Sequence, residues 1–289
     1  MSLLQSVIEQ SLLFFPLICA IYLSYVVMKI TDLSVDSTMV LGSAITAKLL
    51  LNGFDPIITI VVVMFSGFIA GVCVGFIQYK NSINDIIAGL LMSFILYSIN
   101  LNIMGKPHLI IMHTDNLIKL VGNSRLILLI ISSISIALFC LFMMNSKFGL
   151  KLRGFGENKN LMRKLGFNPE LYRFLGLGIS GCIAAVCGSI TSQIYGYTDI
   201  NMGMGMAITT IGALVIGMHL ISKIKFFSVK LSEHNTAIEL FGCFLGIFCY
   251  FGISNSLILF EINPINFKLI FALIIICSLK LTKKSGIAN

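Results

Sequence analysis

The sequence of 289 residues contains little charge. Only 11% of its residues are Asp, Glu, Lys or Arg, whereas 57% are hydrophobic, and the mean hydropathy is +0.98. Runs such as IITIVVVMFSGFIAGVCVGFI at 57–77 exceed what the core of a soluble protein of this length uses. These values exclude a soluble globular protein and indicate a polytopic membrane protein.

Motifs of catalysis and metal binding are also missing. No GxxxxGK[ST] phosphate loop occurs, so the chain by itself cannot couple ATP hydrolysis to work. The four histidines show no HExxH pattern or carboxylate partner at ligand spacing, and the eight cysteines are scattered as singles without a CxxC framework. We therefore expect no enzyme activity, no metal site and no cofactor, and any energy source must be a gradient or a partner.

The sequence does contain apolar segments at roughly even intervals, each close to the ~20 residues that a helix needs to cross the hydrocarbon layer. They centre on 11–29, 37–51, 57–78, 86–104, 126–145, 174–195, 204–222, 237–260 and 266–281. We expect an all-α fold of about eight to ten transmembrane helices in one domain, 1–289. The first segment should remain as a helix, because no cation precedes Leu12 and no small-residue cleavage site follows the run.

Positive charge is concentrated in one stretch. KLRGFGENKNLMRKLGFNPELYR at 151–173 holds six of the twenty cations, and short loops rich in Lys and Arg stay in the cytoplasm. The sequence therefore predicts a cytoplasmic loop at 146–173, with the first residues outside. Alternating spans then place more lysines inside, namely Lys29, Lys80, Lys223, Lys225, Lys230, Lys283 and Lys284. The opposing cations are Lys106, Lys119 and Arg125. The net charge of +8 thus indicates topology and contact with the anionic lipid of an inner membrane, and no nucleic-acid surface.

The same stretch has a local structural pattern. ENKNLMRKL at 157–165 can form two helical turns, and Gly166 can take the left-handed conformation that ends a helix. The apolar side chains would share one side of this helix: Leu161, Met162 and Leu165. The next helix would start at Asn168, Pro169 and Glu170, which are typical of an N-cap and first turn. A short helix between two spans is costly to order unless its exposed face binds something, and a solvated basic loop is the alternative.

Two segments place an aspartate before a helix rich in small residues. ITDLSVDSTMVLGSAITA at 30–47 contains Asp32 and Asp36, and YGYTDINMGMGMAITTIGALVIG at 195–217 contains Asp199. A carboxylate at such a place either caps a helix or faces water, and both roles remain open. Five predicted spans separate the two segments, and an odd number of spans inverts the second copy. The sequence thus predicts an inverted-topology repeat, which is common in transporters with a pathway between the halves.

A third stretch, GFIAGVCVG, places Gly67, Gly71 and Gly75 on one helix face. Such a face permits close contact between helices. It predicts packing and not a function.

Several of these stretches resemble a known family. DLSVDSTMVLGSA, NDIIAGLLMSFILYSINLNIMGK at 84–106, and 156–206, from GENKNLMRKLG to NMGMGM, are similar to the membrane subunits of ABC importers. The branch that the chain resembles handles aromatic amino acids such as tryptophan and tyrosine, and the branched-chain amino acid and ribose permeases are more distantly similar. The resemblance covers most of 12–222.

The resemblance implies an assembly with partners. These would be a second permease subunit, expected to be an identical copy, two cytoplasmic ATPases, and an external substrate-binding protein, all arranged around a lipid bilayer. Residues 157–167 look like the coupling helix that docks in a groove of the ATPase. The residues expected to couple are Glu157, Leu161, Arg163, Lys164, Leu165 and Gly166. Those expected along the substrate pathway are Asp32, Asp36 and Asp199.

Two departures from the family pattern lie near this pathway. Ser37 follows Asp36 where the family usually has glycine, and Met218 and His219 follow Gly217 where an acidic residue is usual. The substrate can therefore differ from the amino acids of the branch.

The leading hypothesis is a permease subunit that moves a small solute, an amino acid or similar compound, by alternating access driven by partner ATPases. A gradient-driven secondary transporter is the alternative, and it would need titratable groups at mid-membrane, for which Asp32, Asp36 and Glu239 are the candidates. A membrane-embedded enzyme would need a nucleophile with a base or a metal cluster, which the sequence does not show. An assembly subunit would show no transport when reconstituted with its neighbours.

Overall fold

The computed structural model describes residues 3–112, 117–122, 124–227, 236–260, 267 and 269–273. The helices are α1 (Leu3–Ile21), which continues as the π-helix η1 (Tyr22–Val27), α2 (Val35–Leu51), α3 (Pro56–Ile77), the 3₁₀ turn η2 (Tyr79–Asn81), α4 (Asp85–Met104), α5 (Leu117–Leu120), α6 (Arg125–Asn145), α7 (Lys147–Glu157), α8 (Lys159–Lys164), α9 (Pro169–Tyr195), α10 (Met206–Phe227) and α11 (Thr236–Leu259). The strands are β1 (His108–Ile110) and β2 (Tyr197–Asp199).

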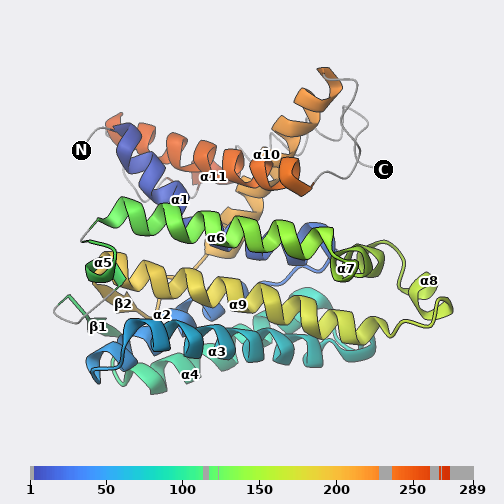
Figure 1. The fold of residues 1–289 in the computed structure, drawn as a ribbon, viewed down its shortest axis with the longest axis horizontal. Helices are drawn as coiled ribbons and strands as arrows, with labels where there is room; N and C mark the ends of the chain where they lie inside the picture. Colours follow the sequence, from blue (N-terminus) through green and yellow to red (C-terminus); the bar gives the residue numbers. More distant parts are fainter. Residues whose placement is uncertain are drawn as a thin grey trace.

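Within this described part, six helices are long and apolar enough to cross a membrane: α1 with η1, α3, α4, α6, α9 and α11. Helices α3, α6 and α9 run along the long axis of the molecule in Figure 1. The all-α polytopic fold is therefore confirmed, with fewer full-length spans than the expected eight to ten. Two further predicted segments form α2, of 17 residues, and α10, whose apolar part is also short. The predicted segment 266–281 lies mostly outside the described residues.

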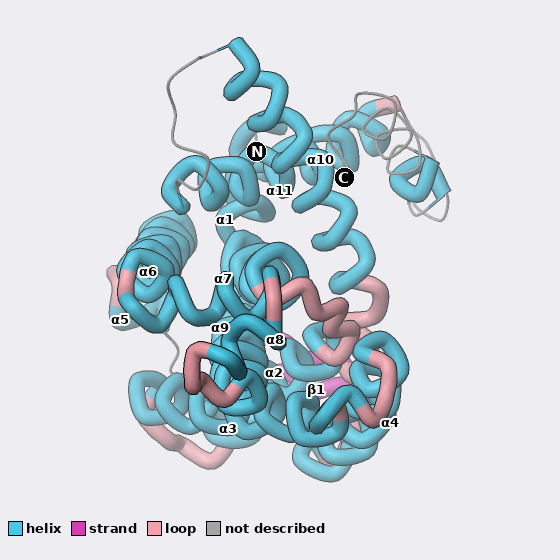
Figure 2. The backbone as a smooth tube through the Cα atoms, turned by 90° about the vertical axis from the view of Figure 1, so that its right-hand side faces the viewer, coloured by secondary structure: helices cyan, strands magenta, loops and turns pink. Residues whose placement is uncertain are grey.

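Helix α9 lies at the centre of the bundle. In its most apolar window 72% of the residues are buried, against 33% in α3, and α9 packs on α1, α2 and α3. Figure 2, which looks along the bundle, shows α9 surrounded by other helices. Glycines permit this proximity, because a Cβ atom on Gly71 would lie 2.0 Å from the carbonyl oxygen of Leu177. Gly67 and Gly75 also face α9, so the predicted packing role of the glycine face is confirmed.

The bundle has two ends, which we name the α8 end and the ribbon end. Helix α8 projects from the first, and the antiparallel pair β1 and β2 lies at the second (Figure 1). In this ribbon His108 is opposite Asp199. Helices α1 and α6 finish at the α8 end, where α7 joins them.

Two helices begin inside the bundle. The turn before α2 lies against α4, where the Ser93 hydroxyl donates to the Leu33 carbonyl oxygen, and the Asn100 amide donates to the Ser37 carbonyl oxygen. The start of α2 is thus level with the middle of α4. Helix α10 starts beside the first turn of α2, as the contacts of Asp36 show below. From this level α2 runs toward the ribbon end and α10 runs past α11 toward the α8 end.

Candidate functional site

The starts of α2 and α10 are joined by one carboxylate, and we name this contact the mid-depth junction. Asp36, in the first turn of α2, accepts hydrogen bonds from the backbone N–H of Gly205 at 3.0 Å and from that of Ala207. A carboxylate in this position satisfies N–H groups that have no partner within α10 and is stabilised by the positive ends of two helix dipoles. Asp36 therefore acts as an N-cap of α10 that is supplied by another helix.

Glycine is required at this junction. A Cβ atom on Gly203 would lie 2.4 Å from the carbonyl oxygen of Asp36 and 2.9 Å from Cγ2 of Val40. The segment before α10 can therefore approach α2 closely only because residue 203 has no side chain.

A cavity of about 410 Å³ lies beside the mid-depth junction. Its polar lining comes from Asp36, Ser37, Ser93 and Asn201. Its apolar lining includes Leu33, Leu90, Phe94, Tyr97, Met204 and Ile208. Small-molecule sites are mostly apolar with a few placed polar groups, and transporter sites commonly lie at mid-membrane between broken helices. Both descriptions fit this cavity.

Only one of the three aspartates predicted for the pathway lines this cavity. Asp32 is 3% exposed, and its Oδ1 accepts a hydrogen bond from the backbone N–H of Ser34 at 2.8 Å, which orders the turn before α2. Asp199 lies in β2, 3.5 Å from Nδ1 of His108, and it also accepts from the N–H of Asn201. The N-cap residue of α2 is Ser34, so Asp32 orders the preceding turn and does not cap the helix, whereas Asp199 belongs to the ribbon.

The segment at the α8 end has largely the local structure that the sequence predicts. Helix α8 ends at Lys164, Gly166 follows with φ +81°, and the N–H of Phe167 donates to the Met162 carbonyl oxygen, as in a Schellman motif. Asn158 caps α8, and Asn168 caps α9, where Pro169 occupies the first turn. The helix starts at Lys159 and not at Glu157.

The expected apolar side of α8 is not a single face. Met162 is buried at 4% exposure, whereas Leu161 and Leu165 are 52% and 63% exposed at the end of the bundle. The difference arises because α8 is only six residues long and turns Met162 alone toward α7. Two leucines four residues apart are thus largely exposed, beside the exposed cations Arg163 and Lys164.

Ion pairs hold this segment to the bundle. Arg173 is fully buried and donates to the carbonyl oxygen of Gln78, and its guanidinium is 3.4 Å from the carboxylate of Glu170. Arg163 on α8 lies 3.9 Å from the same carboxylate. Burial lowers the pKa of Lys159, and the nearby charge of Arg173 lowers this pKa further. Glu157 ends α7 and pairs with Lys29 at 3.1 Å, so it was wrongly expected in the helix of the docking segment.

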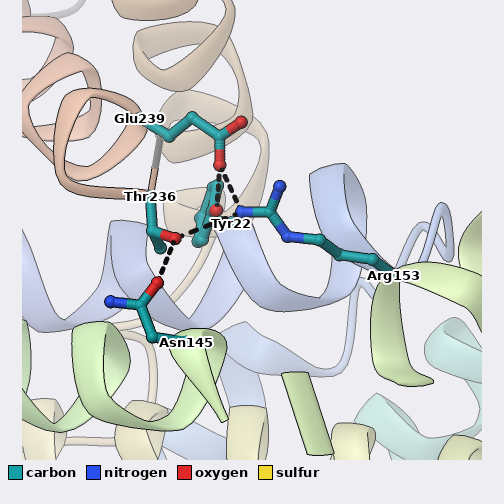
Figure 3. A network of polar contacts seen from close by, with 5 residues as sticks. All are labelled: Tyr22, Asn145, Arg153, Thr236 and Glu239. Carbon is teal, nitrogen blue, oxygen red and sulfur yellow. Dashed lines mark hydrogen bonds and ion pairs between the residues drawn. The ribbon is translucent and has the colours of Figure 1, made fainter. Parts of the chain in front are cut away.

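A polar network at the α8 end was missed from the sequence (Figure 3). Oε2 of Glu239 accepts hydrogen bonds from the Tyr22 hydroxyl at 2.5 Å and from Nη2 of Arg153 at 2.9 Å. Thr236 and Asn145 extend the network to α6. Of these residues, the sequence indicated only Glu239, as a candidate titratable group at mid-membrane for a gradient-driven transporter. The structure places it in the first turn of α11 with a cationic partner.

The described residues include no group of three His, Cys, Asp or Glu side chains that could hold a metal ion. The candidate functional site consists of the cavity, the Asp36 carboxylate that lines it and the segment at the α8 end.

Comparison with known proteins adds independent information. Residues 9–279 match the family described as the permease component of branched-chain amino acid transport systems. The chain is 38% identical to Uncharacterized protein RP368 of Rickettsia prowazekii (strain Madrid E), over 99% of this chain and 100% of that one. It is 31% identical to the tyrosine transport system permease protein of Clostridioides difficile (strain R20291), over 96% and 91% of the two chains. A galactofuranose transporter permease of Escherichia coli (strain K12) is 25% identical over 64% of this chain and 55% of its own length. No solved structure matches the chain.

Proposed function

Because the chain belongs to the family of branched-chain amino acid transport permease components, we propose that it is the membrane subunit of an ABC importer that moves a small solute. The observation that carries the proposal is the mid-depth junction, where two oppositely directed helices start beside one cavity. Broken helices whose positive ends face a mid-membrane cavity are a recurrent way to bind solutes during alternating access.

The α8 end is proposed to be cytoplasmic and to bind the ATPase. Leu161 and Leu165 are exposed on α8 at the end of the bundle, and the cations Arg163 and Lys164 lie beside them. This charge also fixes the α8 end inside the cell, which leaves the ribbon end outside for a substrate-binding protein. The proposed sites of coupling include Gly166, because its left-handed backbone sets the direction in which α8 projects.

A second copy of the chain is proposed to close the cavity. Phe94 and Met204 line the cavity and are 72% and 66% exposed, so one subunit does not cover it. A pathway between two copies would cover both side chains and shield a moving solute from lipid.

The substrate is proposed to be an amino acid or a similar compound. A relative that aligns over nearly the whole chain is named as a tyrosine permease. Ser37, which departs from the glycine of the family pattern, lines the cavity. A hydroxyl at this place changes which polar groups of a solute are satisfied, so the substrate can differ from that of the relative.

The gradient-driven alternative has weaker support. Asp32 does not line the cavity. Asp36 accepts two backbone hydrogen bonds, which stabilise its charged form, and Glu239 is paired with Arg153. Residues held in this way are poor proton carriers, because protonation would break the contacts that position them.

The proposal is tested by reconstituting the chain in liposomes with a candidate ATPase and a candidate substrate-binding protein from the same genome, and measuring uptake of labelled amino acids. Uptake should require ATP in the compartment that the α8 end faces and should persist when ionophores remove ion gradients. An ATPase variant that cannot hydrolyse ATP is the matched control. Uptake that follows an imposed gradient without ATP would replace the proposal by the secondary transporter.

Orientation is tested on the same chain by labelling single cysteines placed near each end of the bundle. Lys159→Cys should react only with reagents that reach the cytoplasm, and Met112→Cys, which is 67% exposed near the ribbon, only with those outside. The opposite pattern would remove the α8 end as the ATPase site.

A further inference from the structure

Helix α7 is seated on the end of α1. A Cβ atom on Gly156 would lie 2.1 Å from the carbonyl oxygen of Val27, so the two backbones touch. Since α8 follows α7 after a single residue, Asn158, a displacement of α8 reaches α1 directly through this contact.

The end of α1 is suited to respond to a displacement. Its last turns form the π-helix η1, and Lys29 follows with φ +56°, a conformation that costs a non-glycine residue about 1 kcal/mol or more. Single π turns within helices occur frequently at functional sites. Residues 28–34 then lead directly to α2 and Asp36, so the end of α1 is covalently close to the mid-depth junction.

Helices α1 and α11 behave as one unit beside this joint. The Tyr22 hydroxyl donates to Glu239 near the α8 end, and the Asn255 amide donates to Oε1 of Gln10 at 2.7 Å toward the ribbon end. Between these contacts the rings of Phe14 and Phe251 stack with centroids 5.4 Å apart. These contacts join the first turn of α11, where Glu239 lies, to α1.

Arg153, on α7, contacts α11 beside a cavity that two carboxylates line. A cavity of about 150 Å³ is lined by Val26, Val27, Arg153, Glu157 and Glu239. Arg153 lies 2.9 Å from Glu239 on α11, and Glu157 lies four residues later on the same face of α7. Glu157 now pairs with Lys29, and both of these side chains are more than half exposed.

We propose that Arg153 is a positioning residue that holds Glu239 in this conformation and changes to Glu157 when the ATPase moves α7 and α8. This inference rests on the proposed function, since it needs an ATPase at the α8 end. In the structure's conformation the Arg153 pair ties α7 to α11 and α1. When Arg153 turns to Glu157, the tie opens and α1 moves relative to α7, which shifts the turn that leads to Asp36.

The Arg153–Glu239 pair is more buried than the Lys29–Glu157 pair, and this difference explains why moving Arg153 from Glu239 to Glu157 has an effect. Arg153 and Glu239 are 17% and 14% exposed, whereas Lys29 and Glu157 are 56% and 68% exposed. Loss of one partner of a largely buried pair leaves an uncompensated charge, but exposed pairs contribute little. The equilibrium between the two arrangements is therefore set by Arg153 and its two acceptors, with Lys29 as a minor competitor.

The test uses the complete complex in lipid nanodiscs with its ATPase and binding protein. The variants Glu239→Gln and Glu157→Gln each remove one acceptor, and Lys29→Gln is the matched control at the exposed pair. Spin labels at Leu150→Cys on α7 and Phe241→Cys on α11, both exposed, report the distance between these helices with the reactive native cysteines replaced.

The wild type should show two distance populations whose ratio changes with ATP. Glu239→Gln should favour the longer separation, and Glu157→Gln the shorter one. Both should reduce substrate-stimulated ATP hydrolysis by at least ~5-fold, the range of a typical coupling between sites. In Glu239→Gln, which lies outside the expected coupling residues, ATPase co-purification and basal hydrolysis should stay unchanged. Lys29→Gln should resemble the wild type.

Three outcomes would overturn the exchange. These are a separation that does not change with ATP, shifts in the same direction for both variants, or loss of basal hydrolysis and ATPase retention in Glu239→Gln, which would indicate a static brace. Failure of the proposed function is distinguishable, because then the wild-type chain itself would neither retain nor stimulate the ATPase.

Discussion

At the mid-depth junction one carboxylate is held by backbone N–H groups, whereas at the α8 end the charged groups are held mainly by one another. Asp36 binds the start of α10 through hydrogen bonds from two backbone N–H groups. Arg153 and Arg173 instead pair with Glu239 and Glu170. Backbone donors have fixed directions, so the junction depends on the relative position of two helices. Side-chain pairs can follow a rotation, and this suits a region that transmits movement.

The largest difference between the regions should appear at Asp36. Asp36→Asn removes a charge from two helix starts, and hydrogen bonds to charged groups contribute about 1.5–3 kcal/mol, so uptake should fall by at least ~10-fold. Membrane insertion and ATPase association should remain. The matched control is Asp55→Asn, at an exposed aspartate that caps only its own helix α3. If Asp36→Asn merely fails to accumulate, the carboxylate has only a structural capping role.

The exposed leucines of α8 should give the next largest effect. Leu161→Asp or Leu165→Asp places a carboxylate on the proposed docking surface, and Gly166→Val strains the left-handed turn by ~1–2 kcal/mol. These variants should be inserted and dimeric but should retain and stimulate the ATPase at least ~5-fold less well. Leu161→Met is the control that keeps the apolar surface. Wild-type co-purification and stimulation in all three variants would return α8 to a plain basic loop.

A smaller effect is expected at the ribbon end. Asp199→Asn removes a half-exposed contact with His108, and such pairs contribute about 0–1 kcal/mol, so uptake should fall by less than ~5-fold. The measurement is initial uptake at saturating solute. A loss as large as that of Asp36→Asn would place Asp199 in the pathway after all.

The smallest effect is expected for a single cation of the α8 end. The stretch from Lys147 to Arg173 contains seven cations, and Lys164→Gln leaves six of them. Topology depends on the total number of nearby cations. Labelling of Met112→Cys in this variant should therefore match that in the parent chain. Reversed labelling would show that the orientation depends on one residue.

The sequence predicted the α8 end well because its signals are local. Gly166, Asn168 and Pro169 act on backbone groups within a few residues, so their roles follow from spacing alone. The apolar segments and the glycine face of α3 were predicted for the same reason. The sequence did not predict the side of α8 on which Met162 lies, because this side is determined by packing against α7.

The contacts between distant segments could not be derived in this way. Nothing near Asp36 in the sequence shows that it caps α10, and nothing near Arg153 indicates Glu239. The short spans α2 and α10 were expected at full depth because apolar length does not reveal where a helix begins within a membrane. These are properties of the assembled bundle.

The central position of α9 also has a consequence for biosynthesis. Helices α1, α2 and α3 pack on α9, yet α9 is synthesised after them, and residue 195 ends it. Until then Gly42 of α2 and the glycine face of α3 lack the helix that they contact in the bundle, and Arg173 cannot donate to the carbonyl oxygen of Gln78. The earlier helices therefore lack their central partner until α9 is synthesised, and the completion of α9 at residue 195 determines when they become a bundle.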